Sequence, residues 1–135
     1  MGVRSIPLPE KSKMQYLTVA EVAQANRKAL AEHTLLAESG DARSDRQHRT
    51  LYAYERGPWR CAIGCALNKE TLAIIAKRRW QKMPLSFLIS KGIVETADNS
   101  LLESLQSDHD FWLRTGLKSR YTQTLENIEK VTGLT

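Results

Sequence analysis

The residues best suited to chemistry form one short run, in which a histidine stands between two carboxylates: Asp108-His109-Asp110. A histidine held by a carboxylate can act as a general base or bind a metal ion. Neighbouring side chains on a helix point about 100° apart, so both carboxylates cannot flank the ring if this run is helical. His109 also lies at helical spacing from Leu105 and Trp112. The alternative interpretation is therefore a half-buried histidine that hydrogen-bonds a neighbouring hairpin.

Two cysteines, Cys61 and Cys65, are the second candidate for chemistry. Two thiols alone cannot complete a tetrahedral zinc site, and the nearest histidine, His48, lies thirteen residues before Cys61. The spacing also differs from the Cys-x-x-Cys of redox enzymes. We expect both cysteines to pack as small hydrophobic side chains, with a metal or redox role as the alternative. Gly64 between them is expected to provide a positive φ or a close backbone approach.

Two tyrosines and two arginines surround a predicted turn at Gly57-Pro58. Tyr52 and Tyr54 would lie on one face of a strand, and Arg56 and Arg60 would flank the turn. Aromatic rings and guanidinium groups together can bind a nucleotide through its base and its phosphates. The alternative is that the two tyrosines face the core of the protein.

Positive charge is concentrated in the middle of the chain. The protein has 20 Lys and Arg against 15 Asp and Glu, and ten basic but only four acidic residues lie between Asp41 and Lys82. Within this segment, Lys77-Arg78-Arg79-Trp80-Gln81-Lys82 is predicted to end an amphipathic helix, where the helix dipole stabilises cations. Phosphate contacts would instead require Arg78 and Lys82 to share an exposed face. The candidates for nucleic-acid binding are Arg43, Arg46, Arg49, Arg78, Arg79 and Lys82.

Length and composition exclude several classes of protein. The chain has 135 residues, of which 41% are hydrophobic and 26% are charged, as in a single globular domain without a membrane span. Residues 1–16 lack the apolar run of a signal peptide, so we expect a cytoplasmic location. The nucleophile elbow, the phosphate-binding loops and the zinc-protease motif are also missing from the sequence. We therefore expect no catalytic residues, no cofactor and no metal.

The elements that would position these residues are mostly helical. Residues 1–16 are expected to form an extended arm, followed by one globular domain over residues 17–135. A capping box of Thr18 and Glu21, an N-cap at Asn68 and the apolar periodicity predict helices over 18–40, 69–80, 85–91, from Asn99 or Ser100 to 116, and 119–131. The last helix is expected to place Tyr121, Leu125, Ile128 and Val131 on its inner face. A hairpin is expected to pair Leu51–Glu55 with Trp59–Ile63. The predicted fold class is α+β, a mainly helical single domain with about five helices and one small β-hairpin.

Three blocks of sequence recur together in one family of proteins. They are Tyr54, Arg56 and Gly57; then Cys61, Ala62, Gly64, Cys65 and Leu67; then Leu105, Gln106, His109, Asp110 and Trp112. These blocks resemble the aromatic-Arg-Gly segment, the Cys-Ala-x-Gly-Cys-Leu block and the Leu-Gln-x-x-His-Asp element followed by a tryptophan of an uncharacterised family of small bacterial and phage proteins. This chain departs from the family at Gly57-Pro58 and at Asn68-Lys69-Glu70. The resemblance, over roughly residues 51–134, implies a shared fold and a mobile-element setting but no particular activity.

These features favour a small non-enzymatic phage or mobile-element protein that occupies a host target. It would inhibit host defence or sequester an anionic ligand in the host cytoplasm, and its partner would be a host protein or an anionic nucleotide, without a membrane. The candidate ligand-binding residues are Tyr52, Tyr54, Arg56, Arg60, Arg78, Arg79, Lys82 and His109. The alternative is a nucleic-acid-binding regulator that uses the basic 41–82 segment. A weaker alternative is a small hydrolase built on His109 and Asp110.

Overall fold

The computed structural model describes residues 15–39 and 53–134, and within these ranges the chain is mainly helical. The helices are α2 (Val19–Glu32), α4 (Lys69–Arg78), α5 (Leu85–Ser90), α6 (Asn99–Thr115) and α7 (Ser119–Thr132). Two short 3-10 helices, η1 (Leu36–Ser39) and η3 (Gly64–Ala66), complete the helical part. The strands are β2 (Gln15–Leu17), β3 (Glu55–Arg56), β4 (Trp59–Arg60) and β5 (Val94–Thr96). The predicted fold class, a mainly helical α+β domain, is confirmed.

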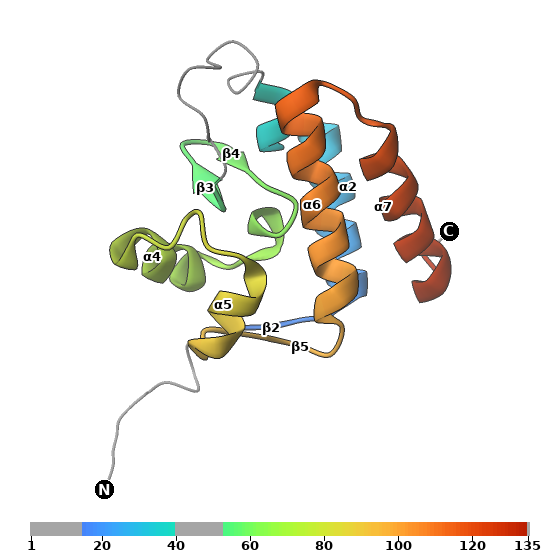
Figure 1. The fold of residues 1–135 in the computed structure, drawn as a ribbon. Helices are drawn as coiled ribbons and strands as arrows, with labels where there is room; N and C mark the ends of the chain where they lie inside the picture. Colours follow the sequence, from blue (N-terminus) through green and yellow to red (C-terminus); the bar gives the residue numbers. More distant parts are fainter. Residues whose placement is uncertain (1–14, 40–52, 135) are drawn as a thin grey trace, which may run out of the picture.

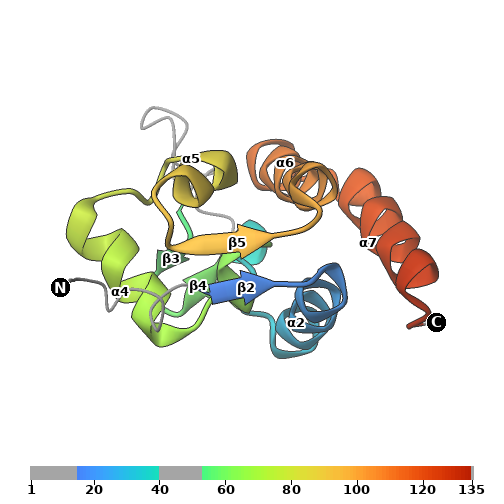
Figure 2. The ribbon, with the colours of Figure 1, turned by 90° about the horizontal axis from the view of Figure 1, so that it is seen from below.

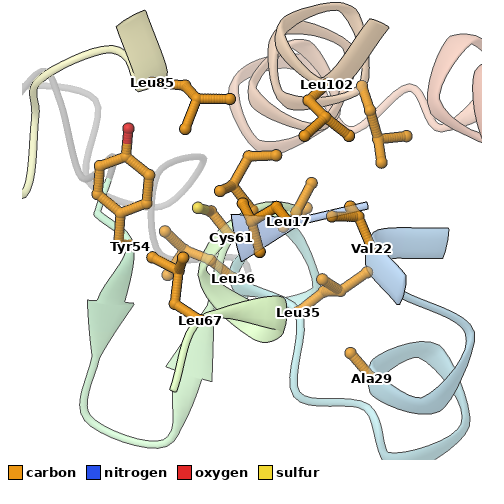
Figure 3. Close-up of a cluster of buried hydrophobic side chains, with 14 of the residues drawn as sticks. Leu17, Val22, Ala29, Leu35, Leu36, Tyr54, Cys61, Leu67, Leu85 and Leu102 are labelled. Atoms are coloured by element: carbon orange, nitrogen blue, oxygen red, sulfur yellow. The ribbon is translucent and has the colours of Figure 1, made fainter. Parts of the chain in front are cut away.

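Helix α6 is the central element of the fold. It packs against α7, α2, α5 and η1, and α7 also packs against α2. Figure 1 shows α6 in front of α2 and beside α7, with α4 and the β3–β4 hairpin on its other side. One stripe of α6 is buried: Leu102, Leu105, His109, Trp112 and Leu113. Figure 3 shows the core from within, where Tyr54, Cys61 and Leu85 lie in one cluster with aliphatic side chains of other elements.

A parallel pair of strands joins distant parts of the chain. Strand β2 pairs with β5, with Gln15 opposite Val94 and Leu17 opposite Thr96. Figure 2 shows the two strands side by side, with α5 and α6 on one side and α2 on the other. Sequence patterns do not predict this pair, and the first two residues of β2, Gln15 and Tyr16, fall within the expected extended arm of residues 1–16.

Helix α2 begins as predicted but ends earlier. The Thr18 hydroxyl accepts the N–H of Glu21, whose carboxylate accepts the N–H of Thr18 in return, so the predicted capping box is confirmed. The expected continuation to residue 40 is wrong, because His33 takes the left-handed conformation (φ 58°) and ends the helix. The chain then turns so that Leu35 and Leu36 are fully buried, which a straight helix would not allow.

The hairpin is shorter than predicted. Among the described residues of the two predicted strands, only 55–56 pair with 59–60, across a turn in which Gly57 has φ +61°. Residues 61–63 leave the ladder because their backbone groups bond other elements: Asn26 donates to the Ala62 carbonyl, and the Ile63 N–H donates to Gln106. Leu51 and Tyr52, in the first predicted strand, lie outside the described residues.

Most of the other predicted helix boundaries are correct to within two residues. Asn68 caps α4 through the N–H of Thr71, as predicted, but α4 ends at Arg78 because Arg79 is left-handed (φ 63°). Asp98, not Asn99 or Ser100, caps α6. Tyr121, Leu125 and Ile128 of α7 are buried as expected, whereas Val131 is 74% exposed and does not belong to the inner face. No helix in the described part of the chain has the length and apolarity to cross a membrane.

Candidate functional site

An open pocket of about 380 Å³ lies between α6 and the segment that connects α4 to α5. This is within the range of roughly 300–1,000 Å³ that is typical of small-molecule sites. Its apolar wall consists of Ala53, Tyr54, Met83, Pro84 and Leu85. Its polar lining consists of Gln81, Lys82, Glu103, Gln106, Ser107, Asp110 and Arg114. A second hollow beside α7 shares Glu103 and Ser107, but it is lined by neither a cation nor an aromatic ring.

Several polar groups of the pocket are held by backbone groups of other elements. The Tyr54 hydroxyl donates to the Met83 carbonyl at 2.6 Å, and burial of the ring raises the pKa of this phenol far above its ordinary value. The side-chain oxygen of Gln106 accepts the N–H of Ile63 at 3.0 Å, and the side-chain NH2 of Gln106 donates to the Asp110 carboxylate at 3.3 Å. These bonds fix the pocket walls before any ligand binds.

Three other groups of the pocket are available to a ligand. Within the described ranges, the side chains of Lys82 and Ser107 have no hydrogen-bond or ion-pair partner, and Arg114 has no ion-pair partner. The Arg114 guanidinium lies 5.5 Å from the centroid of the Phe111 ring. All three residues are exposed to solvent. The pocket therefore offers two cations and a hydroxyl beside an apolar wall.

His109 lies behind the pocket rather than in it. The ring is fully buried, its Nε2 accepts the N–H of Ala37 at 3.2 Å, and its Nδ1 lies 3.1 Å from the Asp110 carboxylate. Because a backbone amide donates to Nε2, the proton belongs on Nδ1, where it is donated to Asp110. The predicted hydrogen bond from His109 to the hairpin is wrong, because η1, not the hairpin, lies next to this part of α6. Both ring nitrogens are occupied, so His109 cannot accept a proton from a substrate in this arrangement.

The two aspartates beside His109 point to different partners, as helical geometry predicts. Asp110 bonds the histidine and lines the pocket. Asp108 instead accepts a hydrogen bond from the Thr124 hydroxyl of α7. The run Asp108-His109-Asp110 therefore ties α6 to η1 and α7.

Of the eight predicted ligand-binding residues, Tyr54 and Lys82 line the pocket. Arg60 instead pairs with Glu55 at 2.9 Å, and Arg56 lies half-buried on β3. Tyr52 lies outside the described residues, as do Arg43, Arg46 and Arg49.

The basic end of α4 does not form the single face that phosphate binding would require. Arg78 lies 5.7 Å from the Trp80 ring, and Arg79 is the left-handed residue that ends the helix. Arg78 and Lys82 are therefore not on successive turns of one helix. The hypothesis that residues 41–82 bind nucleic acid stays a prediction.

Sequence reasoning missed the polar face of α6. Each α6 residue that lines the pocket is three or four positions from another one: Glu103, Gln106, Ser107, Asp110 and Arg114. This is the spacing of one helical face, which lies beside the buried stripe of Leu105, His109 and Trp112 that the periodicity did identify. The signal was therefore present in the sequence, as a second stripe of polar rather than apolar residues.

The two cysteines are packed and protonated. Cys61 is buried, its sulfur accepts the N–H of Gly64 at 3.2 Å, and burial raises the pKa of its thiol to about 12. Cys65 bonds the Ala62 carbonyl, and burial likewise raises the pKa of its thiol. Among the described residues, no group of three or more His, Cys, Asp or Glu could hold a metal ion. This geometry fits the packing interpretation of both thiols.

Comparison of the chain with protein-family models, curated proteins and solved structures gives no match. What the pocket can bind follows from its own side chains. It combines two cations, two carboxylates, a free hydroxyl and an apolar wall.

Proposed function

We propose that this protein is a non-enzymatic binding protein that sequesters a small anionic ligand in the pocket between α6 and the α4–α5 segment. The observation that carries this proposal is the pair of exposed cations, Lys82 and Arg114, which line the pocket without an ion-pair partner among the described residues. Phosphate and carboxylate groups are the natural partners of such cations, and an arginine can bind either with two hydrogen bonds.

The carboxylates of the pocket restrict the ligand further. Glu103 and Asp110 would repel a ligand that carries only negative charge, but they can accept hydrogen bonds from an amine or amide. The wall of Met83, Pro84 and Leu85 favours a flat apolar part between these two ends. A nucleotide combines a phosphate, a flat base and exocyclic amines, so it is the ligand class that we propose.

The first test is the binding of a mononucleotide, with adenosine monophosphate as the probe and isothermal calorimetry as the measurement. We expect Lys82→Gln to weaken binding by about tenfold, the scale of one charge-assisted contact. Lys77→Gln is the matched control, because Lys77 is an exposed lysine of α4 that does not line the pocket. If neither adenosine nor guanosine monophosphate binds, or if both variants bind as well as the wild type, the proposal is wrong.

The resemblance to small bacterial and phage proteins supports a narrower form of this proposal. In that form the protein acts in the host cytoplasm and removes a nucleotide signal on which antiviral defence depends. The test is phage growth on a defended host that expresses the wild type, Lys82→Gln or Lys77→Gln. We expect the wild type and Lys77→Gln to restore growth and Lys82→Gln to fail, whereas equal growth with all three would contradict this role.

A further inference from the structure

A group of three cations surrounds the connection between α6 and α7. Arg114 is in the last turn of α6, Lys118 precedes α7, and Arg120 is in its first turn. No acidic residue occurs from Phe111 to Leu125, and within the described ranges none of the three cations has an ion-pair partner. All three are exposed. We call this group, Arg114, Lys118 and Arg120, the cationic turn. Figure 1 shows the connection between α6 and α7 at the upper end of α6.

Aromatic rings hold the three cations in place. The guanidinium groups of Arg120 and Arg114 lie 4.1 Å and 5.5 Å from the centroid of the Phe111 ring, so one ring contacts both groups. The Lys118 ammonium lies 5.1 Å from the centroid of Trp112. Cation–π contacts of this kind order the side chains before a partner arrives, so less conformational entropy is lost on binding. The N–H groups that the rings do not use remain available for phosphate oxygens.

Arg114 belongs both to the cationic turn and to the pocket. Positive groups therefore continue from Lys82, across the pocket, to the end of α6 and the start of α7. Resting on the proposed function, we infer that the pocket also takes the nucleotide at one end of a single-stranded nucleic acid. One nucleotide occupies the pocket, and the phosphates that follow it contact Arg114, Arg120 and Lys118.

The chemistry favours a single strand over a duplex or an acidic protein. A base can enter a pocket only when it is neither paired nor stacked on its neighbours, and a single strand provides such bases. Ordered arginines beside a pocket fit a chain of regularly spaced phosphates with a base at one end. An acidic protein would meet the same cations but would have no flat group for the pocket.

The test compares a mononucleotide with a strand. The probes are adenosine monophosphate and a fluorescein-labelled oligoadenylate of about twelve nucleotides, with DNA and RNA sugars in separate arms. We expect the strand to bind more tightly than the mononucleotide. Replacing Lys118 and Arg120 together by Gln should weaken strand binding about tenfold and leave mononucleotide binding unchanged. It should also reduce the slope of log K against log salt by about 1.4, since each phosphate contact contributes about 0.7.

The control variant also removes two positive charges, but from another part of the protein surface. Lys28→Gln with Lys130→Gln changes two exposed cations that belong to neither the pocket, the cationic turn nor the basic 41–82 segment, and we expect it to bind both probes normally. Lys82→Gln should weaken both probes, because it acts on the pocket. If the mononucleotide binds but the strand gains nothing, the strand proposal is overturned and the proposed function stands. If polyglutamate displaces the strand as well as unlabelled oligoadenylate does, the cationic turn is a general anion surface and the strand proposal is likewise wrong.

Discussion

Gly64 is the position where one added methyl group should do most damage to the fold. Its φ lies outside the left-handed region, so conformational freedom is not what requires glycine here. A Cβ at this position would lie 1.9 Å from the backbone oxygen of Tyr54 and 2.7 Å from its carbonyl carbon. Of the two reasons that the sequence offered for a glycine, close backbone approach is therefore the one that applies.

The magnitude follows from how little the neighbours can move. Real Cβ contacts essentially never fall below 3.0 Å, so Gly64→Ala requires a separation of about 1 Å between two buried backbone segments. Two hydrogen bonds hold the segment around Tyr54 in place: the Tyr54 hydroxyl donates to the Met83 carbonyl, and the Glu55 N–H donates to the side-chain oxygen of Gln81. Overpacking of a rigid core costs about 1–3 kcal/mol. Since a hydrogen bond worth about 1 kcal/mol would also be strained, we expect a loss of about 3 kcal/mol in the free energy of unfolding.

The assay is urea denaturation followed by tryptophan fluorescence, with Gly92→Ala as the control. Gly92 has φ +77° and nothing within 4 Å of its added Cβ, so its variant carries only the left-handed strain of about 1 kcal/mol. We expect Gly64→Ala to unfold at clearly lower urea than Gly92→Ala, and to bind mononucleotide less well because Tyr54 lines the pocket. Equal midpoints for the two variants would refute the argument from close approach.

Three further predictions concern single contacts. Arg27 donates two hydrogen bonds of 2.6 and 2.7 Å to the Glu129 carboxylate, and these bonds lower the pKa of that carboxylate. The pair therefore stabilises the folded protein fully above the ordinary glutamate pKa of about 4.3. This stabilisation is lost as the pH falls through the lowered pKa. Glu129→Gln should therefore cost about 2 kcal/mol at pH 7 and flatten the acid limb of stability against pH; an unchanged acid limb would contradict this. Cys61→Ala should lower the free energy of unfolding by about 1 kcal/mol and leave ligand binding intact. Lost binding at an unchanged melting temperature would show instead that the thiol takes part in binding. Thr18→Ala should cost about 1 kcal/mol through the capping box of α2, measured as a lower urea midpoint, and an unchanged midpoint would argue against it.

Local signals predicted the helices well. Thr18 and Asn68 start α2 and α4 because a capping side chain acts on N–H groups three residues away, within reach of sequence reasoning. The end of α2 depends instead on Leu35 and Leu36, which must turn into a core built by distant elements. His33 ends the helix for that reason, without a glycine to mark the place.

Long-range pairing was beyond local reasoning. Strand β2 has three residues and pairs with a strand almost eighty positions later, so neither segment carries a periodicity that marks it as a strand. The pocket shows the same limit in part. Lys82 and Tyr54 were candidates from their residue types, but only the fold shows that they face the polar stripe of α6.

The polar groups of the pocket also form hydrogen bonds that hold the core together. Tyr54 bonds the Met83 carbonyl, Gln106 bonds the backbone of Ile63, and Asp110 holds His109, which in turn accepts the N–H of Ala37. The Tyr54–Met83, Gln106–Ile63 and Ala37–His109 bonds each join two elements, and the Asp110–His109 bond orients the ring within α6. These groups therefore cannot turn toward a ligand without loosening the packing behind them. Preorganised groups of this kind lose little entropy on binding. Selectivity for a ligand would then come from the fixed carboxylates and affinity from the free cations, and substitutions of the two kinds should separate these properties.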